Sequence, residues 1–134
     1  MRKIILLFLF FPLFLVAQEA QPETKKSNYI YSSVEVNPEP PGGINAFRQY
    51  VATELMHYLG DIKEPLQVSV LIRFIVTEEG TLSDYELVRE SVNSYNLGKR
   101  AIFVIKNSPK WKPGLMNGRN VKVYYSFPIK FNIN

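Results

Sequence analysis

Hydrophobic and polar residues alternate regularly in two stretches of the chain. Over residues 121–133 valine, tyrosine, phenylalanine and isoleucine fill the odd positions, and over residues 66–76 leucine, valine, isoleucine and phenylalanine fill the even ones. Successive side chains of a strand point to opposite faces of a sheet. Both stretches are therefore predicted to be strands that bury one face in a core.

A third strand is predicted over residues 82–90. The sequence Thr-Glu-Glu-Gly-Thr at 77–81 supplies a turn, with Gly80 at a position that tolerates a positive φ angle, so the second strand returns along the first as a hairpin. The hydrophobic phase slips between Leu82 and Leu87. Such a slip predicts a β-bulge in this strand.

Two segments have helical spacing instead. Hydrophobic residues recur every three or four positions over residues 44–59, ending at Gly60, and again over residues 97–105, ending before Pro109. The order of elements is helix, strand, strand, helix, strand. This order predicts an α+β fold, with two helices packed on one face of a three-stranded antiparallel sheet.

The segments before the first helix and before the last strand are rich in proline. Residues 37–43 read Asn-Pro-Glu-Pro-Pro-Gly-Gly, and we expect the prolines to hold the chain extended and away from the sheet until the glycines allow it to reverse into the helix. Residues 108–114 read Ser-Pro-Lys-Trp-Lys-Pro-Gly, a rigid connector whose tryptophan is expected to cover the core. The residues with these structural roles are Pro41, Gly42, Gly43, Trp111, Pro113 and Gly114.

The N-terminal region divides the chain into three parts. After a basic start, residues 4–17 are hydrophobic, but they are fewer than the roughly 20 residues of a membrane-spanning helix. We interpret residues 1–17 as a signal peptide that is cleaved before Gln18, with an uncleaved membrane anchor as the alternative. Residues 18–33 are a polar leader or linker, and residues 34–134 form the domain.

Composition narrows the classes of function. Cleavage removes two of the 16 basic residues and none of the 12 acidic ones, so the net charge falls from +4 to about +2, which does not indicate a nucleic-acid partner. The chain has no cysteine, which excludes disulfides and thiol chemistry. An exported, cysteine-free domain of this size fits a periplasmic location.

The sequence does not indicate an enzyme or a metal site. His57 is the only histidine, and a catalytic pair with Ser69 or Asp61 would need a geometry that the sequence does not predict. One histidine, two aspartates and no cysteine give no ligand cluster at usable spacing. We therefore predict no catalytic, cofactor-binding or metal-binding residues, and no cofactor.

The last strand carries a candidate binding edge. Pro128 has no N–H group, so a strand tolerates it only where that group would face away from a neighbouring strand. This predicts that 121–133 is an edge strand with its even-numbered backbone groups on the open side; the alternative is that Pro128 protects the edge against pairing. The residues assigned to partner binding are Lys122, Tyr124, Ser126, Pro128, Lys130 and Asn132.

Several motifs resemble the C-terminal domain of the TonB energy-transducer family, in the form common in Bacteroidetes. They are the proline-rich segment 34–47, the hairpin 78–91, residues 106–123 around Trp-Lys-Pro-Gly, and the Phe-Pro-x-x-Phe motif at 127–131. The resemblance implies the fold of that domain. It also implies a non-enzymatic module that serves energy-coupled transport across the outer membrane.

In that family the partner is the N-terminal peptide of a TonB-dependent outer-membrane receptor, which adds a strand to the sheet. The resemblance implies contact with a proton-driven inner-membrane motor only if residues 1–17 are an uncleaved anchor. The alternative function is an envelope structural or assembly module. Such a module would pair the same edge with a second copy, giving a homodimer, or with another envelope protein.

Overall fold

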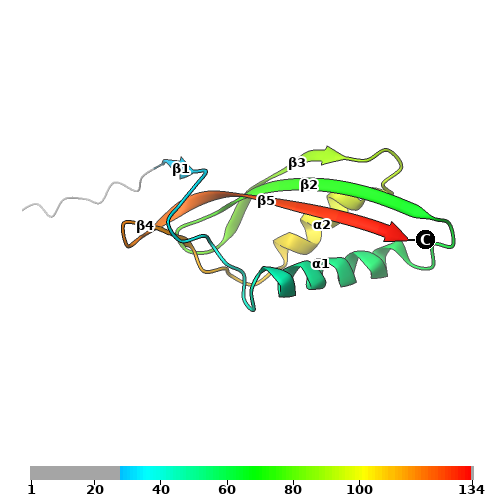
Figure 1. Ribbon diagram of the computed structural model, residues 1–134, viewed down its shortest axis with the longest axis horizontal. Coiled ribbons are helices and arrows are strands. Elements are labelled where there is room, and N and C mark those ends of the chain that lie inside the picture. The colour runs from blue at the N-terminus through cyan, green and yellow to red at the C-terminus, as the bar shows by residue number, and fades with distance from the viewer. Residues whose placement is uncertain (1–27, 134) are drawn as a thin grey trace, which may run out of the picture.

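The structure is a computed structural model that describes residues 28–133. Two helices and five strands follow one another along this part of the chain (Figure 1). Their bounds are β1 Ile30–Tyr31, α1 Ile44–Leu59, β2 Leu66–Val76, β3 Leu82–Glu90, α2 Leu97–Lys106, β4 Gly114–Met116 and β5 Arg119–Ile133.

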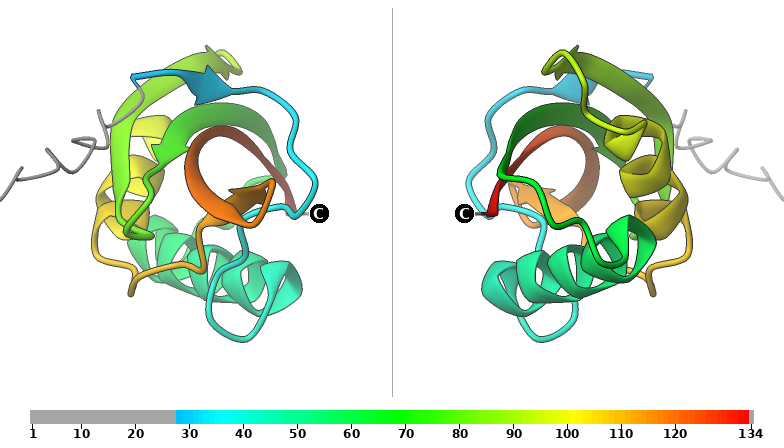
Figure 2. Two further views of the ribbon diagram at one scale, coloured as in Figure 1. Left: turned by 90° about the vertical axis from the view of Figure 1, so that its left-hand side faces the viewer. Right: turned by 90° about the vertical axis from the view of Figure 1, so that its right-hand side faces the viewer.

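The sheet has the strand order β1-β5-β2-β3, and β4 pairs with the beginning of β5. The central pair is antiparallel and unbroken from Leu66↔Ile133 to Val76↔Val123. β1 pairs in parallel with β5, through Ile30↔Lys122 and Tyr31↔Val123. The sheet curls strongly, and both helices lie on the same side of it (Figure 2).

The predicted fold class is confirmed: two helices cover one face of a sheet whose three long strands are antiparallel. The alternation in β2 and β5 has the predicted effect, because the even residues of β2 and the odd residues of β5 face the helices. Most of these side chains are buried, as are Phe47, Val51, Leu55 and Leu59 of α1 and Leu97, Ala101, Val104 and Ile105 of α2.

An aromatic cluster closes one end of this core. Trp111 is 3 % exposed, and its ring lies 5.0 Å from that of Phe47, 5.5 Å from Phe74 and 5.0 Å from Tyr125. The backbone N–H of Trp111 donates a hydrogen bond to the Gly80 carbonyl over 2.9 Å. A Cβ atom on Gly80 would lie 1.9 Å from the Trp111 carbonyl oxygen, so only glycine lets the hairpin and the connector approach this closely.

The expectation that the proline-rich segment stays away from the sheet is wrong. Val36 exchanges two backbone hydrogen bonds with Leu115 of β4, and Glu39 exchanges two with Lys112. A Cβ atom on Gly114 would lie 2.6 Å from a Val123 methyl group, so Gly114 allows this layer to pack against β5. The segment forms these backbone bonds at Val36 and Glu39, on either side of Pro38, which the sequence pattern alone did not reveal.

The reversal into α1 occurs at the expected glycines. Gly42 and Gly43 have φ angles of 78° and 89°, in the left-handed region that favours glycine, and α1 begins at Ile44. The leader was predicted as residues 18–33, but Ile30 and Tyr31 within it form β1. The predicted signal peptide, residues 1–17, lies outside the described residues. Within residues 28–133 no helix has the length and hydrophobicity needed to cross a membrane.

Candidate functional site at the open edge of the last strand

β5 has a long edge that no strand of the described residues covers. β4 pairs with its first residues, from Arg119 to Val121, and β1 pairs with Lys122 and Val123. On the side away from β2, residues 124–133 have no strand partner in the described part of the chain. We call this side of residues 124–133 the open edge.

The direction of the backbone groups on β5 follows from hydrogen bonds on β2. Ser69 of β2 points both its N–H and its carbonyl away from β5: the N–H donates to Ser91 Oγ over 2.8 Å, and the carbonyl accepts from the Ser91 N–H over 2.9 Å. Ser69 lies opposite Lys130 of β5. In an antiparallel pair such opposed residues both point their backbone groups outward, and the direction alternates along each strand.

The even-numbered residues of β5 therefore present their backbone groups to the open edge. Three of them offer both an N–H and a carbonyl: Ser126, Lys130 and Asn132. Tyr124 offers its carbonyl only, because the parallel pairing of Tyr31 with Val123 directs the Tyr124 N–H to the Tyr31 carbonyl. Pro128 offers a carbonyl only, and its missing N–H costs the pair with β2 nothing, because it lies opposite Leu71 at an outward-pointing position. Lys122, which we assigned to partner binding, lies outside the open edge because β1 pairs with it.

The side chains of these even-numbered residues lie on the face of the sheet opposite the helices. Ser126, Pro128, Lys130 and Asn132 are exposed, and Tyr124 is half-buried. The Arg73 guanidinium lies 4.7 Å from the centre of the Tyr124 ring, and it also forms an ion pair of 2.7 Å with Glu86 of β3. This ion pair is exposed, so its contribution to stability is small.

The helices leave room for one more strand beside the open edge. α2 packs under β2 and β3, and Phe47 of α1 packs under Phe127 of β5 with the ring centres 5.2 Å apart. A helix is about 10 Å wide and strands are about 4.8 Å apart, so two helices cover roughly four strand positions. Over residues 124–129 only three of these positions are filled, by β3, β2 and β5.

The positive charge of Arg48 on α1 acts on a residue of β5. Burial raises the pKa of the Tyr125 hydroxyl, and the positive charge of Arg48 lowers it in part. Tyr125 belongs to β5 and points toward the helices, which places the Arg48 cation on the β5 side of α1. The sequence pattern did not single out Arg48, because it falls between the buried residues Phe47 and Val51 and reads as an ordinary surface charge.

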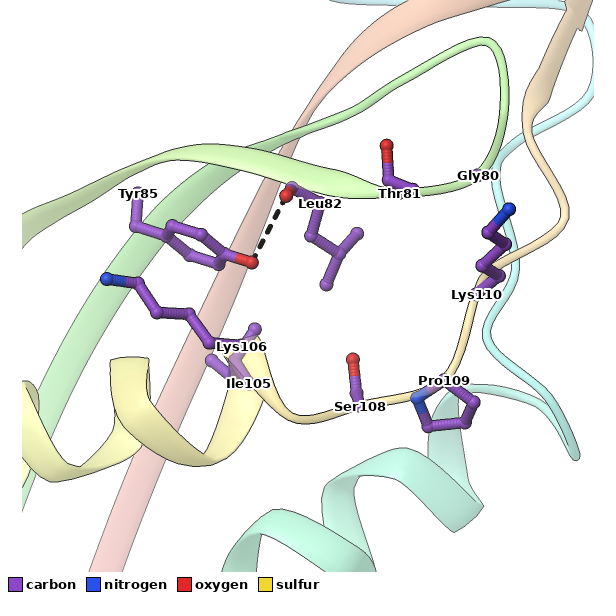
Figure 3. A pocket seen from close by; sticks show the side chains of 9 residues that line it. All are labelled: Gly80, Thr81, Leu82, Tyr85, Ile105, Lys106, Ser108, Pro109 and Lys110. Carbon is purple, nitrogen blue, oxygen red and sulfur yellow. Dashed lines mark hydrogen bonds between the residues drawn. The ribbon is translucent and has the colours of Figure 1, made fainter.

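The structure also contains a small cavity away from the open edge, of about 150 Å³, between the β2–β3 turn and the end of α2 (Figure 3). The Ser108 hydroxyl oxygen is buried without a hydrogen-bond partner and points toward Leu82. Tyr85 donates a hydrogen bond to the Leu82 carbonyl over 3.2 Å, and burial raises the pKa of the Tyr85 hydroxyl. This volume is of the order that holds a few water molecules.

The residues considered for catalysis do not come together. His57 is exposed on α1, and Ser69 is bonded to Ser91 rather than to a histidine. Asp61 is exposed in the loop after α1. Among residues 28–133, no group of three or more histidine, aspartate or glutamate side chains could hold a metal ion.

Comparison with known proteins gives one match. The family described as Gram-negative bacterial TonB protein C-terminal matches residues 62–133, which is more than half of the chain and contains β2, β3, α2, β4 and β5. No curated protein sequence and no solved structure matches. The open edge lies wholly inside the matched region, whereas α1 lies before it.

Proposed function

The chain belongs to the TonB C-terminal family, and we propose that it binds the N-terminal peptide of a TonB-dependent outer-membrane receptor as an added strand on the open edge. In this role the domain would support energy-coupled transport across the outer membrane. The domain is a protein-interaction module, and the proposal assigns it no catalytic step or cofactor.

The observation that carries this proposal is the length and regularity of the open edge. Three N–H groups, of Ser126, Lys130 and Asn132, and five carbonyls of even-numbered residues, from Tyr124 to Asn132, point toward the position of a fourth strand. An extended peptide placed there would form about four to six hydrogen bonds, and at 0.5–1.5 kcal/mol each these contribute roughly 2–9 kcal/mol before the cost of association. We expect dissociation constants in the micromolar range or weaker.

The same proposal includes export. Residues 1–17 would direct the chain to the periplasm and be removed before Gln18. If these residues instead remain as an anchor, the chain would be held at the inner membrane, where it could contact a proton-driven motor. The mass of the protein recovered from the membrane and soluble fractions of its host distinguishes the two forms.

The test of strand addition is a pair of substitutions at Ser126. Ser126→Pro removes an N–H that points to the open edge and that makes no bond to β2, so it should weaken peptide binding at least tenfold while the domain stays folded. Ser126→Ala removes only the hydroxyl and should bind as the unsubstituted protein does. Synthetic peptides from the N-terminal regions of the host's TonB-dependent receptors are the ligands, titrated by fluorescence anisotropy.

Equal affinity of the proline and alanine variants would exclude this edge as the binding site. Light scattering on the same samples tests the alternative in which the edge pairs with a second copy. A stable dimer that Ser126→Pro converts to a monomer, and that does not bind any receptor peptide, would replace the receptor proposal with self-pairing.

A further inference from the structure

One flank of α1 faces away from α2, on the side of the open edge, and only Ala52 of this flank packs against the core. Tyr58 marks the opposite flank, because its hydroxyl donates to the Tyr95 carbonyl before α2 and its ring lies 5.2 Å from Arg100 of α2. Met56 precedes Tyr58 by two residues, which turns it about 200° around the helix and away from α2. Met56 is 45 % exposed, so its side chain is accessible to a partner.

Three residues at four-residue spacing run along this flank: Arg48, Ala52 and Met56. Arg48 and Met56 are exposed, and Ala52 is half-buried and packs against the core. A surface hollow of about 370 Å³ follows the same part of α1, lined by Gln49, Ala52, Thr53, Met56 and His57. The flank thus offers a cation at one end and, toward the other, a shallow hollow to which Ala52 and Met56 contribute hydrophobic surface.

The spacing of Arg48, Ala52 and Met56 along α1 is close to the spacing of the side chains on one face of a strand. Helical residues rise by about 1.5 Å each, so Arg48, Ala52 and Met56 are spaced by about 6 Å along the axis. Side chains on one face of a strand, at positions i, i+2 and i+4, are spaced by about 6.8 Å. α1 and β5 run in the same direction (Figure 1), so a strand laid along the open edge also runs along this row.

We propose that the flank formed by Arg48, Ala52 and Met56 selects the partner strand by its side chains, an inference that rests on the strand addition proposed above. The selected strand carries an acidic side chain facing Arg48, followed at two-residue steps by hydrophobic side chains that face Ala52 and Met56. Backbone pairing on the open edge accepts any extended sequence except proline, so it cannot discriminate between receptors. The flank of α1 supplies the discrimination.

The charge at the first position provides the test. Synthetic ten-residue peptides contain Glu-Thr-Leu-Thr-Leu or Lys-Thr-Leu-Thr-Leu within a threonine-rich sequence, and each is also made with the order reversed so that either strand direction is sampled. The purified protein should bind the glutamate peptide about tenfold more tightly than the lysine peptide in at least one direction. Arg48→Glu should invert this preference, and Met56→Lys should weaken both peptides.

Arg89→Glu is the matched control, because Arg89 is an exposed arginine on β3 and its replacement changes the net charge equally. Circular dichroism checks that each variant is folded. If Arg48→Glu and Arg89→Glu alter the glutamate-to-lysine ratio to the same extent, the flank does not select the strand and this inference is overturned.

Ser126→Pro separates that failure from a failure of the proposed function. Suppose that Ser126→Pro weakens binding of the glutamate peptide while Arg48→Glu leaves the preference for glutamate over lysine unchanged. Strand addition is then supported, and only the proposed selection by α1 is contradicted. If Ser126→Pro has no effect on a peptide that binds, the open edge is not the site and both proposals fall. Absence of binding by all four peptides would contradict the inference as well.

Discussion

β3 and β5 are the outer long strands of the sheet, and their free edges are built differently. β5 pairs with β2 without a register shift over its whole paired length, from Val123 to Ile133. β3 pairs with the same strand through two register shifts, one beside Val88 and one that includes Asp84. Asp84 lies in the left-handed region with a φ angle of 52°. One edge is regular, and the other is interrupted twice within nine residues.

This difference bears on which of the two edges an incoming strand would pair with. β-Bulges twist an edge and break its series of hydrogen-bonding groups, which is a common protection against unwanted pairing. β3 is also fastened to α2 at its end, where the Glu90 carboxylate accepts hydrogen bonds from the Ser94 hydroxyl and, over 2.9 Å, from the Gly98 N–H. The protection found on β3 is missing from β5 between residues 124 and 133.

Proline on the inner side of β5 gives the largest expected effect. Ile129 lies opposite Val70, and its N–H points toward β2, so Ile129→Pro removes a sheet hydrogen bond and a buried side chain. We expect it to lower the free energy of unfolding by about 4 kcal/mol, whereas Ser126→Pro should lower it by less than about 1 kcal/mol. Chemical denaturation measures both. Similar losses for the two variants would show that the assigned direction of the backbone groups is wrong.

The bulge on β3 gives a smaller effect. A β-branched residue does not adopt the left-handed conformation of Asp84, so Asp84→Val should lower the free energy of unfolding by about 1–2 kcal/mol. Asparagine tolerates this conformation, and Asp84→Asn should be nearly neutral. Receptor-peptide affinity should be the same for both variants, since the bulge lies on the other edge. A loss of affinity in Asp84→Val alone would assign part of the site to β3.

The smallest effect concerns two tyrosines, one on each outer strand. Burial raises the pKa of Tyr85 on β3 and of Tyr125 on β5 above the ordinary value of 10.0. The folded state favours the neutral phenols, so the stability they contribute is present below pH 10.0 and declines as the pH rises through 10.0 toward the folded-state pKa.

Arg48 lowers the pKa of Tyr125 only, so Arg48→Gln should raise that pKa further and leave the pKa of Tyr85 unchanged. An NMR titration of the tyrosine ring carbons follows each residue separately. Equal shifts of the two tyrosines, or no shift of Tyr125, would contradict the placement of the Arg48 cation beside β5.

The sequence was sufficient for the elements that bury a periodic face. β2 and β3 have the predicted bounds, α1 begins and ends where the glycines indicated, and α2 extends one residue beyond its prediction. β1 and β4 were missed, because strands of two and three residues are too short to show a period and gain their hydrogen bonds from β5. Long-range pairing, rather than local preference, determines such strands.

Only part of the candidate site could be predicted from the sequence. Pro128 indicated which side of β5 is open, because a missing N–H is a local property that restricts pairing. The row of Arg48, Ala52 and Met56 could not be found in this way. Its position beside the open edge depends on tertiary packing, because α2 packs on β2 and β3 and α1 packs on β5. The cover of Lys122 by β1 likewise depends on a tertiary contact that no local pattern encodes.

Hydrogen exchange of the backbone amides, followed by NMR with and without a bound receptor peptide, tests the central claim most directly. Strand addition on the open edge predicts slower exchange at three even-numbered amides, Ser126, Lys130 and Asn132, and unchanged exchange along β3. The odd-numbered amides between them are already bonded to β2 and should change little. Slower exchange along β3, or unchanged exchange at all three of these amides, would contradict the account.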